Sequence, residues 1–234
     1  MRLWIEAAGV YALLVAFHFI LVWRSGAFNA EFGEYPDESA HFVTALMVRD
    51  YLRTGLGQPP MSFAENYYLH YPKVALGHYP PLLYVVEALW MIVFPASRPS
   101  ILALNALLAA ATGLMIYFTA KRLFGRFHAL SAGLLWIFLY LVQMFYGMVI
   151  AEPLAVCLAF GAILCYARYL ETERWQASAW FGLLAGLAIL TKQVMLFLAL
   201  LPPLAVIFSG KWRLFARPGF WLAAGIALLV AGPW

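Results

Sequence analysis

The sequence predicts an all-α integral membrane protein with about seven transmembrane helices and two interfacial helices in its first extracytoplasmic loop. Hydrophobic residues make up 65% of the 234 residues and charged residues only 11%, whereas soluble domains carry about 25% charged residues. The apolar runs are continuous rather than alternating, which indicates membrane helices and not a barrel. The net charge of +4 predicts no nucleic-acid partner, because the basic residues lie in short loops between apolar runs.

The first apolar run, residues 4–23, has the roughly 20 residues that a membrane span needs. Trp4 and Trp23 bracket it, as aromatic residues do at membrane surfaces. No small-residue cleavage site follows the run, so we expect an uncleaved first helix rather than a signal peptide.

The first long loop, residues 24–98, predicts two short helices. Polar and apolar residues alternate at helical spacing over 39–54, which favours a helix lying in the membrane interface, with Asp37 as its N-cap. Residues 55–77 are rich in glycine and proline and predict a loop. The apolar run 80–95 is too short for a span and is bounded by prolines, which favours a second interfacial helix.

Two side chains in these short helices have expected orientations. Glu87, in the second helix, is expected to face solvent. His41 follows Asp37 by four residues and Glu38 by three, so it is expected to share their helix face.

Six further spans are predicted after the long loop. Gly182 and Gly186 are expected at positions of close helix packing. If Arg2 is cytoplasmic and 80–95 does not cross, nine of the 15 lysines and arginines lie inside and six outside, as the positive-inside rule favours. The spans are 100–120, 127–146, 153–169, 177–191, 194–209 and 220–234.

This topology places four separated polar turns on the extracytoplasmic face, where they predict a site. The first turn is strongly acidic, because four of the 11 acidic residues of the chain fall within eight positions. These four acidic residues are Glu31, Glu34, Asp37 and Glu38. The other three polar turns are His78-Tyr79-Pro80-Pro81, Glu152-Pro153 and Thr191-Lys192.

The same turns, in this order, carry a family resemblance. Asp37-Glu38, Gly77-His78-Tyr79-Pro80-Pro81-Leu82, Lys121-Arg122-Leu123-Phe124-Gly125, Glu152-Pro153 and Leu190-Thr191-Lys192 follow one another along the chain. The set resembles the GT-C membrane glycosyltransferases, in particular the protein O-mannosyltransferase and lipid A aminoarabinose transferase group. Members of that group are usually longer, so residues 1–234 are expected to be an N-terminal transmembrane catalytic module with a missing C-terminal part.

The resemblance implies the chemistry. It implies a sugar donor linked to polyprenyl phosphate, a protein or lipid acceptor, and transfer with inversion in a bacterial or archaeal plasma membrane. Asp37 maps to the proposed base, with Glu38 beside it, and Glu152 maps to the acidic position of the second loop. His78-Tyr79 stands where aminoarabinose transferases carry Glu-Lys, so the resemblance implies a divalent metal ion at His78. With Tyr79 in place of that lysine, donor phosphate binding is left to Lys192, Lys73, Arg98 or Arg49.

These residue types suit the reaction. A carboxylate within hydrogen-bond reach deprotonates an acceptor hydroxyl, and cations stabilise a departing phosphate strongly where water is scarce.

Structural roles are the alternatives at each position. Asp37-Glu38 and Glu152 are also consistent with carboxylates that stabilise the start of a helix. His78 is also consistent with a loop histidine that bonds a backbone carbonyl. Lys192 is also consistent with a lysine that extends to the membrane interface.

Two other functions compete with sugar transfer. A transporter or flippase for a lipid-linked or anionic solute is one, although the predicted polar groups lie at loop–helix junctions and no repeated half is visible. A non-catalytic assembly subunit is the other, and it predicts that the acidic turns tolerate substitution.

Overall fold

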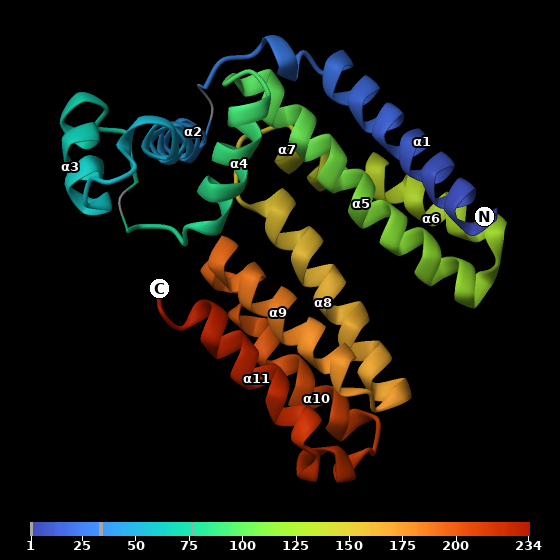
Figure 1. Cartoon of the computed structure of the whole chain (residues 1–234). Helices are drawn as coiled ribbons and strands as arrows, with labels where there is room; N and C mark the ends of the chain where they lie inside the picture. The colour runs from blue at the N-terminus through green and yellow to red at the C-terminus, as the bar shows by residue number, and fades with distance from the viewer. Residues whose placement is uncertain (1, 33–34, 76) are drawn as a thin grey trace. The chain divides into compact units, whose positions relative to one another are not determined.

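The computed structural model describes residues 2–32, 35–75 and 77–234, and all regular secondary structure in these ranges is helical (Figure 1). The prediction of an all-α protein is therefore confirmed for the described residues. Gly33 and Glu34 of the acidic turn lie outside them. The chain divides into two compact units, Met1–Pro153 and Leu154–Trp234, and each is described by itself.

Three long helices form the centre of the first unit. Helix α1 (Arg2–Arg24) packs on α5 (Arg98–Phe124), and α5 packs on α6 (Arg126–Phe138), as the side-by-side ribbons of Figure 1 show. Leu14 is fully buried among them. A Cβ atom on Gly113 of α5 would lie 3.0 Å from Leu14 Cδ1, so the glycine leaves the room that this leucine fills.

A charged cluster holds the start of α1 against the other two helices. Glu6 Oε1 lies 2.6 Å from Lys121 Nζ and 3.3 Å from Arg126 Nε, and it accepts a hydrogen bond from the Tyr117 hydroxyl. The lysine comes from the end of α5 and Arg126 from the start of α6, so one carboxylate ties three helices together.

The predicted span 127–146 is wrong in one respect, because the helix breaks. Helix α6 ends at Phe138, α7 (Tyr140–Tyr146) follows, and the two axes differ by 54°. Leu139 between them is extended, and the Gln143 side-chain amide donates to the freed carbonyl of Ile137 at 2.6 Å. A side chain thus replaces the backbone donor that the break removes.

The loop between α1 and α5 is more helical than predicted. It contains α2 (Pro36–Asp50), a π-helical turn (Tyr51–Gly55), α3 (Pro60–His70) and α4 (Leu82–Val93). The predicted loop 55–77 is wrong over α3, where a proline stands in the first turn of the helix, a position that proline favours.

Helix α2 also begins earlier than predicted. Its N-cap is Tyr35, which makes no side-chain capping bond, and Pro36 is the first helical residue. Asp37 therefore lies inside the first turn and is not the N-cap. A carboxylate there still interacts favourably with the helix dipole.

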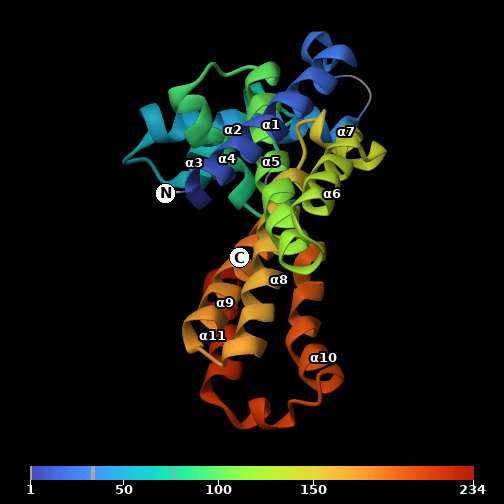
Figure 2. The same ribbon diagram turned by 90° about the vertical axis from the view of Figure 1, so that its right-hand side faces the viewer.

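The second unit packs α8 (Glu152–Thr172, nearly all of it in this unit), α9 (Trp175–Thr191), α10 (Leu201–Phe208) and α11 (Pro218–Ala231) around one apolar core (Figure 2). A 3₁₀ segment, Gln193–Leu200, connects α9 to α10.

Helices α9 and α11 approach each other closely at two glycines. A Cβ atom on Gly182 would lie 2.5 Å from the Ala223 carbonyl oxygen, and one on Gly186 would lie 2.8 Å from Val230 Cβ. The prediction of close packing at these glycines is confirmed.

Within the part of the chain that the structure describes, three helices are long and apolar enough to cross a membrane: Leu3–Arg24, α5 and α8. The bent pair of α6 and α7 makes a fourth if the two count as one span. Helix α9, the segment Gln193–Phe208 and α11 are apolar but shorter, at 10–17 residues. Seven spans therefore stay a prediction.

We expect Gly182→Ala to lower the free energy of unfolding by about 1–3 kcal/mol, because its methyl group overlaps the α11 backbone. Gly225→Ala in α11 is the matched control, since a Cβ atom there meets nothing within 4 Å. Thermal unfolding of both variants in the same lipid checks this. Equal midpoints for the two variants would contradict the close approach.

Candidate functional site

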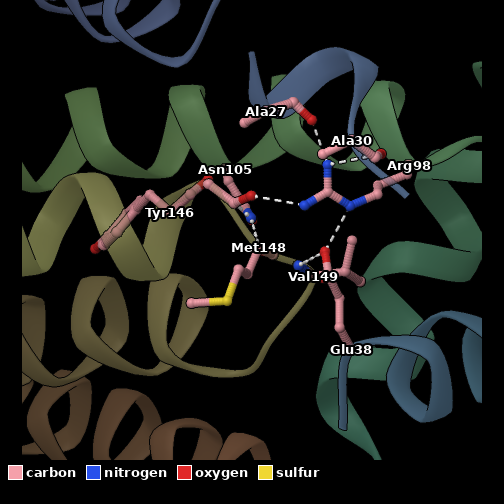
Figure 3. A network of polar contacts seen from close by, with 9 residues as sticks. Ala27, Ala30, Glu38, Arg98, Asn105, Tyr146, Met148 and Val149 are labelled. Atoms are coloured by element: carbon pink, nitrogen blue, oxygen red, sulfur yellow. Dashed lines mark hydrogen bonds and ion pairs between the residues drawn. The ribbon is translucent and has the colours of Figure 1, made fainter. Parts of the chain in front are cut away.

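One carboxylate of the acidic turn, Glu38, forms a buried ion pair with Arg98. Glu38 is in the first turn of α2, and Arg98 is the first residue of α5. Arg98 Nε donates to Glu38 Oε1 at 2.7 Å, and the two side chains are only 8% and 3% exposed (Figure 3). Charges this far from water are stable only when paired and hydrogen-bonded.

The rest of the Arg98 guanidinium binds backbone carbonyl groups. It donates to Ala27 O, to Ala30 O at 3.3 Å and to Gly147 O at 3.0 Å. Figure 3 shows these bonds converging on one guanidinium from segments far apart in the sequence. A planar group with five donors suits such a cradle, and a lysine ammonium does not.

The same network fixes the loop before α8. Glu38 Oε1 accepts a second bond from the Val149 backbone amide at 3.0 Å, and the Asn105 side-chain amide donates to the Met148 carbonyl at 2.8 Å. This loop leads directly to Glu152, the first residue of α8. The network therefore fixes the backbone next to both candidate carboxylates: at Glu38, which follows Asp37, and at Val149, which precedes Glu152.

Asp37 lies next to the buried pair but points to a different partner. It is half-buried, and its Oδ2 accepts a hydrogen bond from the Tyr79 hydroxyl at 3.0 Å. Burial raises the pKa of Tyr79 above its usual value, and the hydrogen bond to Asp37, its charge and the charge of Glu152 add to this effect. Both carboxylates therefore act on one phenol, which places Asp37 and Glu152 in the same neighbourhood.

Two histidine rings contact Tyr79. The His41 ring centroid lies 4.7 Å from that of Tyr79, and its Nδ1 is within hydrogen-bond distance of the Tyr84 hydroxyl, at 3.2 Å. The His78 ring contacts Tyr79 edge-on at 4.8 Å. His41 is buried and His78 is exposed, so only His78 is open to a ligand without rearrangement.

The predicted orientation of Glu87 is wrong. It is 1% exposed, because α4 packs against α2 and α5 and this position is buried in that packing. Its Oε2 atom has no hydrogen-bond partner among the described residues. Burial raises the pKa of Glu87 to about 8, so the carboxyl group stays protonated at neutral pH.

The predicted phosphate-binding cations have different surroundings. Arg98 is occupied by Glu38 and the carbonyl groups. Lys73 is exposed after α3 and makes no hydrogen bond or ion pair with the described residues. Lys192 lies in the second unit, as the C-cap of α9. Arg49 is paired with Asp50 at 2.6 Å.

The metal ion predicted at His78 stays a prediction. Within the described residues, no three His, Cys, Asp or Glu side chains are grouped closely enough to hold one.

The sequence predicted Asp37 and Glu152 as site residues, and these stay predictions, but two features of this region were missed. Tyr79 was interpreted only as a missing positive charge, whereas its hydroxyl binds Asp37. Glu38 and Arg98 were assigned to catalysis and to phosphate binding, and nothing in the sequence indicated that they pair across 60 positions. Their reactive roles stay predictions.

The chain was compared with known proteins at family, sequence and structure level. The model of the dolichyl-phosphate-mannose-protein mannosyltransferase family matches residues 78–234. The comparison with curated proteins and the comparison with solved structures each gave no significant match.

We expect Arg98→Lys to lower the free energy of unfolding by about 3 kcal/mol or more, because an ammonium group leaves several buried acceptors unsatisfied. Arg49→Lys is the control, since the Arg49–Asp50 pair is partly exposed and is expected to change stability by less than about 1 kcal/mol. Denaturant titration in one detergent checks both. Similar losses would show that the buried network adds little.

We expect the stability of the wild type to fall with rising pH relative to Glu87→Gln. The folded chain keeps the proton of Glu87 up to about pH 8, whereas the unfolded chain releases it near 4.5, the ordinary value. The stabilising contribution is therefore complete below pH 4.5 and is lost progressively as pH rises through 8. Unfolding midpoints from pH 5 to 8.5 measure this difference.

The control for that series is Glu65→Gln, which changes an exposed carboxylate of α3. Its difference from the wild type is expected to stay constant with pH. A constant difference for Glu87→Gln as well would refute the buried neutral carboxyl group.

Proposed function

Because this chain belongs to the dolichyl-phosphate-mannose-protein mannosyltransferase family, we propose that it moves a sugar from a polyprenyl-phosphate donor to a protein hydroxyl or lipid acceptor. The family match and the apolar helices support a membrane glycosyltransferase of the GT-C type.

The observation that carries the proposal is the position of Asp37. Its carboxylate is half-buried, its neighbour Glu38 is locked to Arg98, and its own oxygen is bound by Tyr79 at 3.0 Å. The backbone beside Asp37 and its carboxylate are thus both fixed, so little conformational entropy is lost when an acceptor hydroxyl binds. Such positioning of a base contributes strongly to the reaction rate.

The proposed reaction is a single displacement. Asp37 takes the proton of the acceptor hydroxyl as the acceptor oxygen forms a bond to the anomeric carbon of the sugar. The bond from that carbon to the donor phosphate oxygen breaks, and polyprenyl phosphate leaves with the electron pair. Attack opposite the leaving group inverts the anomeric configuration.

Other residues have supporting roles in this proposal. Tyr79 positions Asp37 through its hydrogen bond, and Glu152, which acts on the same phenol, is suited to bind a hydroxyl of the sugar or acceptor. Lys73, exposed and without an ion pair among the described residues, is available to the donor phosphate. Lys192 keeps the same role from the family resemblance alone.

We also propose the seven-span topology with the acidic turn on the extracytoplasmic face. Helix α9 has 17 residues, so it is about 25 Å long, slightly less than the roughly 30 Å hydrocarbon core. A short span is accommodated by local thinning of the bilayer. Helix α4, with 12 residues, is too short to cross and supports the interfacial assignment.

The test measures sugar transfer from a pool of polyprenyl-phosphate donors by the purified chain in lipid. We expect Asp37→Asn to reduce turnover by about 100-fold or more, because the base is lost. Glu31→Gln, an exposed carboxyl change in the same loop, is the control and is expected to keep wild-type turnover.

Equal turnover in wild type and Asp37→Asn would remove Asp37 from the role of base. A folded wild type that binds the donor without transferring sugar would favour the transporter or the assembly subunit instead.

A further inference from the structure

A second candidate site lies in the second unit, at the end where α8 stops and both α9 and α11 begin. It is a pocket of about 540 Å³. Its wall includes aromatic, charged and glycine residues. Six of them matter here: Tyr169, Glu173, Arg174, Trp175, Arg217 and Gly219.

The pocket exists because of how α8 ends and α11 begins. Glu173 adopts a left-handed conformation with φ of 52°, and its amide donates to the Tyr169 carbonyl at 2.8 Å, which ends the helix. At the start of α11, a Cβ atom on Gly219 would lie 3.1 Å from the Tyr169 hydroxyl oxygen. The glycine therefore leaves the space that forms the pocket floor.

The pocket carries available positive charge. The Arg174 guanidinium forms no ion pair with the described residues. Arg217 is 61% exposed and lies 3.9 Å from Glu173, and exposed pairs of this kind are held weakly. At this end of the unit, five basic residues face two acidic ones, a net charge of +3; they are Arg168, Arg174, Lys211, Arg213 and Arg217 against Glu171 and Glu173.

A tyrosine hydroxyl group adds a neutral donor. Tyr169 is 1% exposed and lines the pocket, yet its hydroxyl makes no hydrogen bond with the described residues. Helices α9 and α11 both begin at this pocket, and the positive ends of their dipoles favour an anion there. These groups together match the acceptor oxygens of a phosphate ester.

The surrounding tryptophans indicate the source of that phosphate. Trp175, Trp212 and Trp221 are each about 60% exposed, at 59%, 59% and 61%, on the segments that form this end of the unit. Exposed tryptophans on membrane helices lie at the level of the lipid headgroups. A basic pocket at that level meets lipid phosphates before it meets phosphate from solution.

We propose that this pocket binds the phosphate-bearing headgroup of an anionic membrane lipid. Arg174 and Arg217 bind the phosphate oxygens, the Tyr169 hydroxyl donates to one of them, and Glu173 accepts a hydrogen bond from a headgroup hydroxyl. With the proposed orientation, the pocket faces the cytoplasmic leaflet, whose anionic lipids attract clustered arginines. The site is independent of sugar transfer.

The experiment titrates the purified full chain, in neutral detergent, with phosphatidylglycerol that carries a fluorescent acyl chain. Unlabelled phosphatidylglycerol, phosphatidylcholine and inorganic phosphate then compete for the bound lipid. The test variants are the double change Arg174→Gln with Arg217→Gln, and Tyr169→Phe. Arg168→Gln is the matched control, because it removes one exposed charge from the same end without touching the pocket.

We expect the double variant to weaken phosphatidylglycerol binding by about tenfold or more. Tyr169→Phe is expected to weaken it by about threefold or more, with the unfolding midpoint unchanged in the absence of lipid. Arg168→Gln is expected to stay within about twofold of the wild type, and phosphatidylcholine to compete poorly.

Three results would overturn the proposal. One is equal affinity in the wild type and the double variant, at matched unfolding midpoints. Another is a loss in Arg168→Gln as large as in the double variant, which would indicate general charge attraction. The third is competition by inorganic phosphate at the concentration at which the lipid competes, which would assign the pocket to free phosphate. None of these results depends on catalytic turnover.

Discussion

The ion pair between Glu38 and Arg98 is the interaction on which the first unit depends. Both side chains are almost completely removed from water, and the arginine also holds carbonyl groups from the segments before α2 and before α8. Removing two charges from water costs more than a single contact returns. The pair is stable because nearly every donor and acceptor around it forms a hydrogen bond. These bonds join the segment before α2, α2 itself, α5 and the loop before α8, so few arrangements of these four segments can satisfy them all.

The half-buried carboxylates Asp37 and Glu152 take their positions from this buried pair. Asp37 is one residue before Glu38, and Glu152 is three residues after Val149, whose amide binds Glu38. Asp37 therefore binds the Tyr79 hydroxyl, and the charge of Glu152, far along the sequence, acts on the same tyrosine from nearby. A reaction that needs a base within hydrogen-bond reach of a bound acceptor benefits from such rigid support, because small displacements of a base cost much of the rate.

Local sequence patterns predicted most of the helices but not the long-range pairing. Apolar runs of about 20 residues identified α1, α5 and α8, since length and composition decide a span. Helix α3 was missed because its prolines were interpreted as loop residues rather than as a helix start. At the bend after α6, the Gln143 side chain bonds the Ile137 carbonyl. No proline lies there, so the sequence contains no common signal for a helix break. Nor does an amphipathic pattern tell which neighbour a helix packs against, so Glu87 was placed on the wrong face.

Hydrogen–deuterium exchange at the Val149 backbone amide tests the central claim most directly, because this amide donates to the carboxylate that Arg98 holds. In the wild type, the account predicts slow exchange in the peptide that covers residues 147–151. In Arg98→Met it predicts exchange at least about tenfold faster there, with the α9 and α11 peptides unchanged. Fast exchange at Val149 in the wild type, or the same slow rate in both proteins, would contradict the claim that this ion pair positions the site.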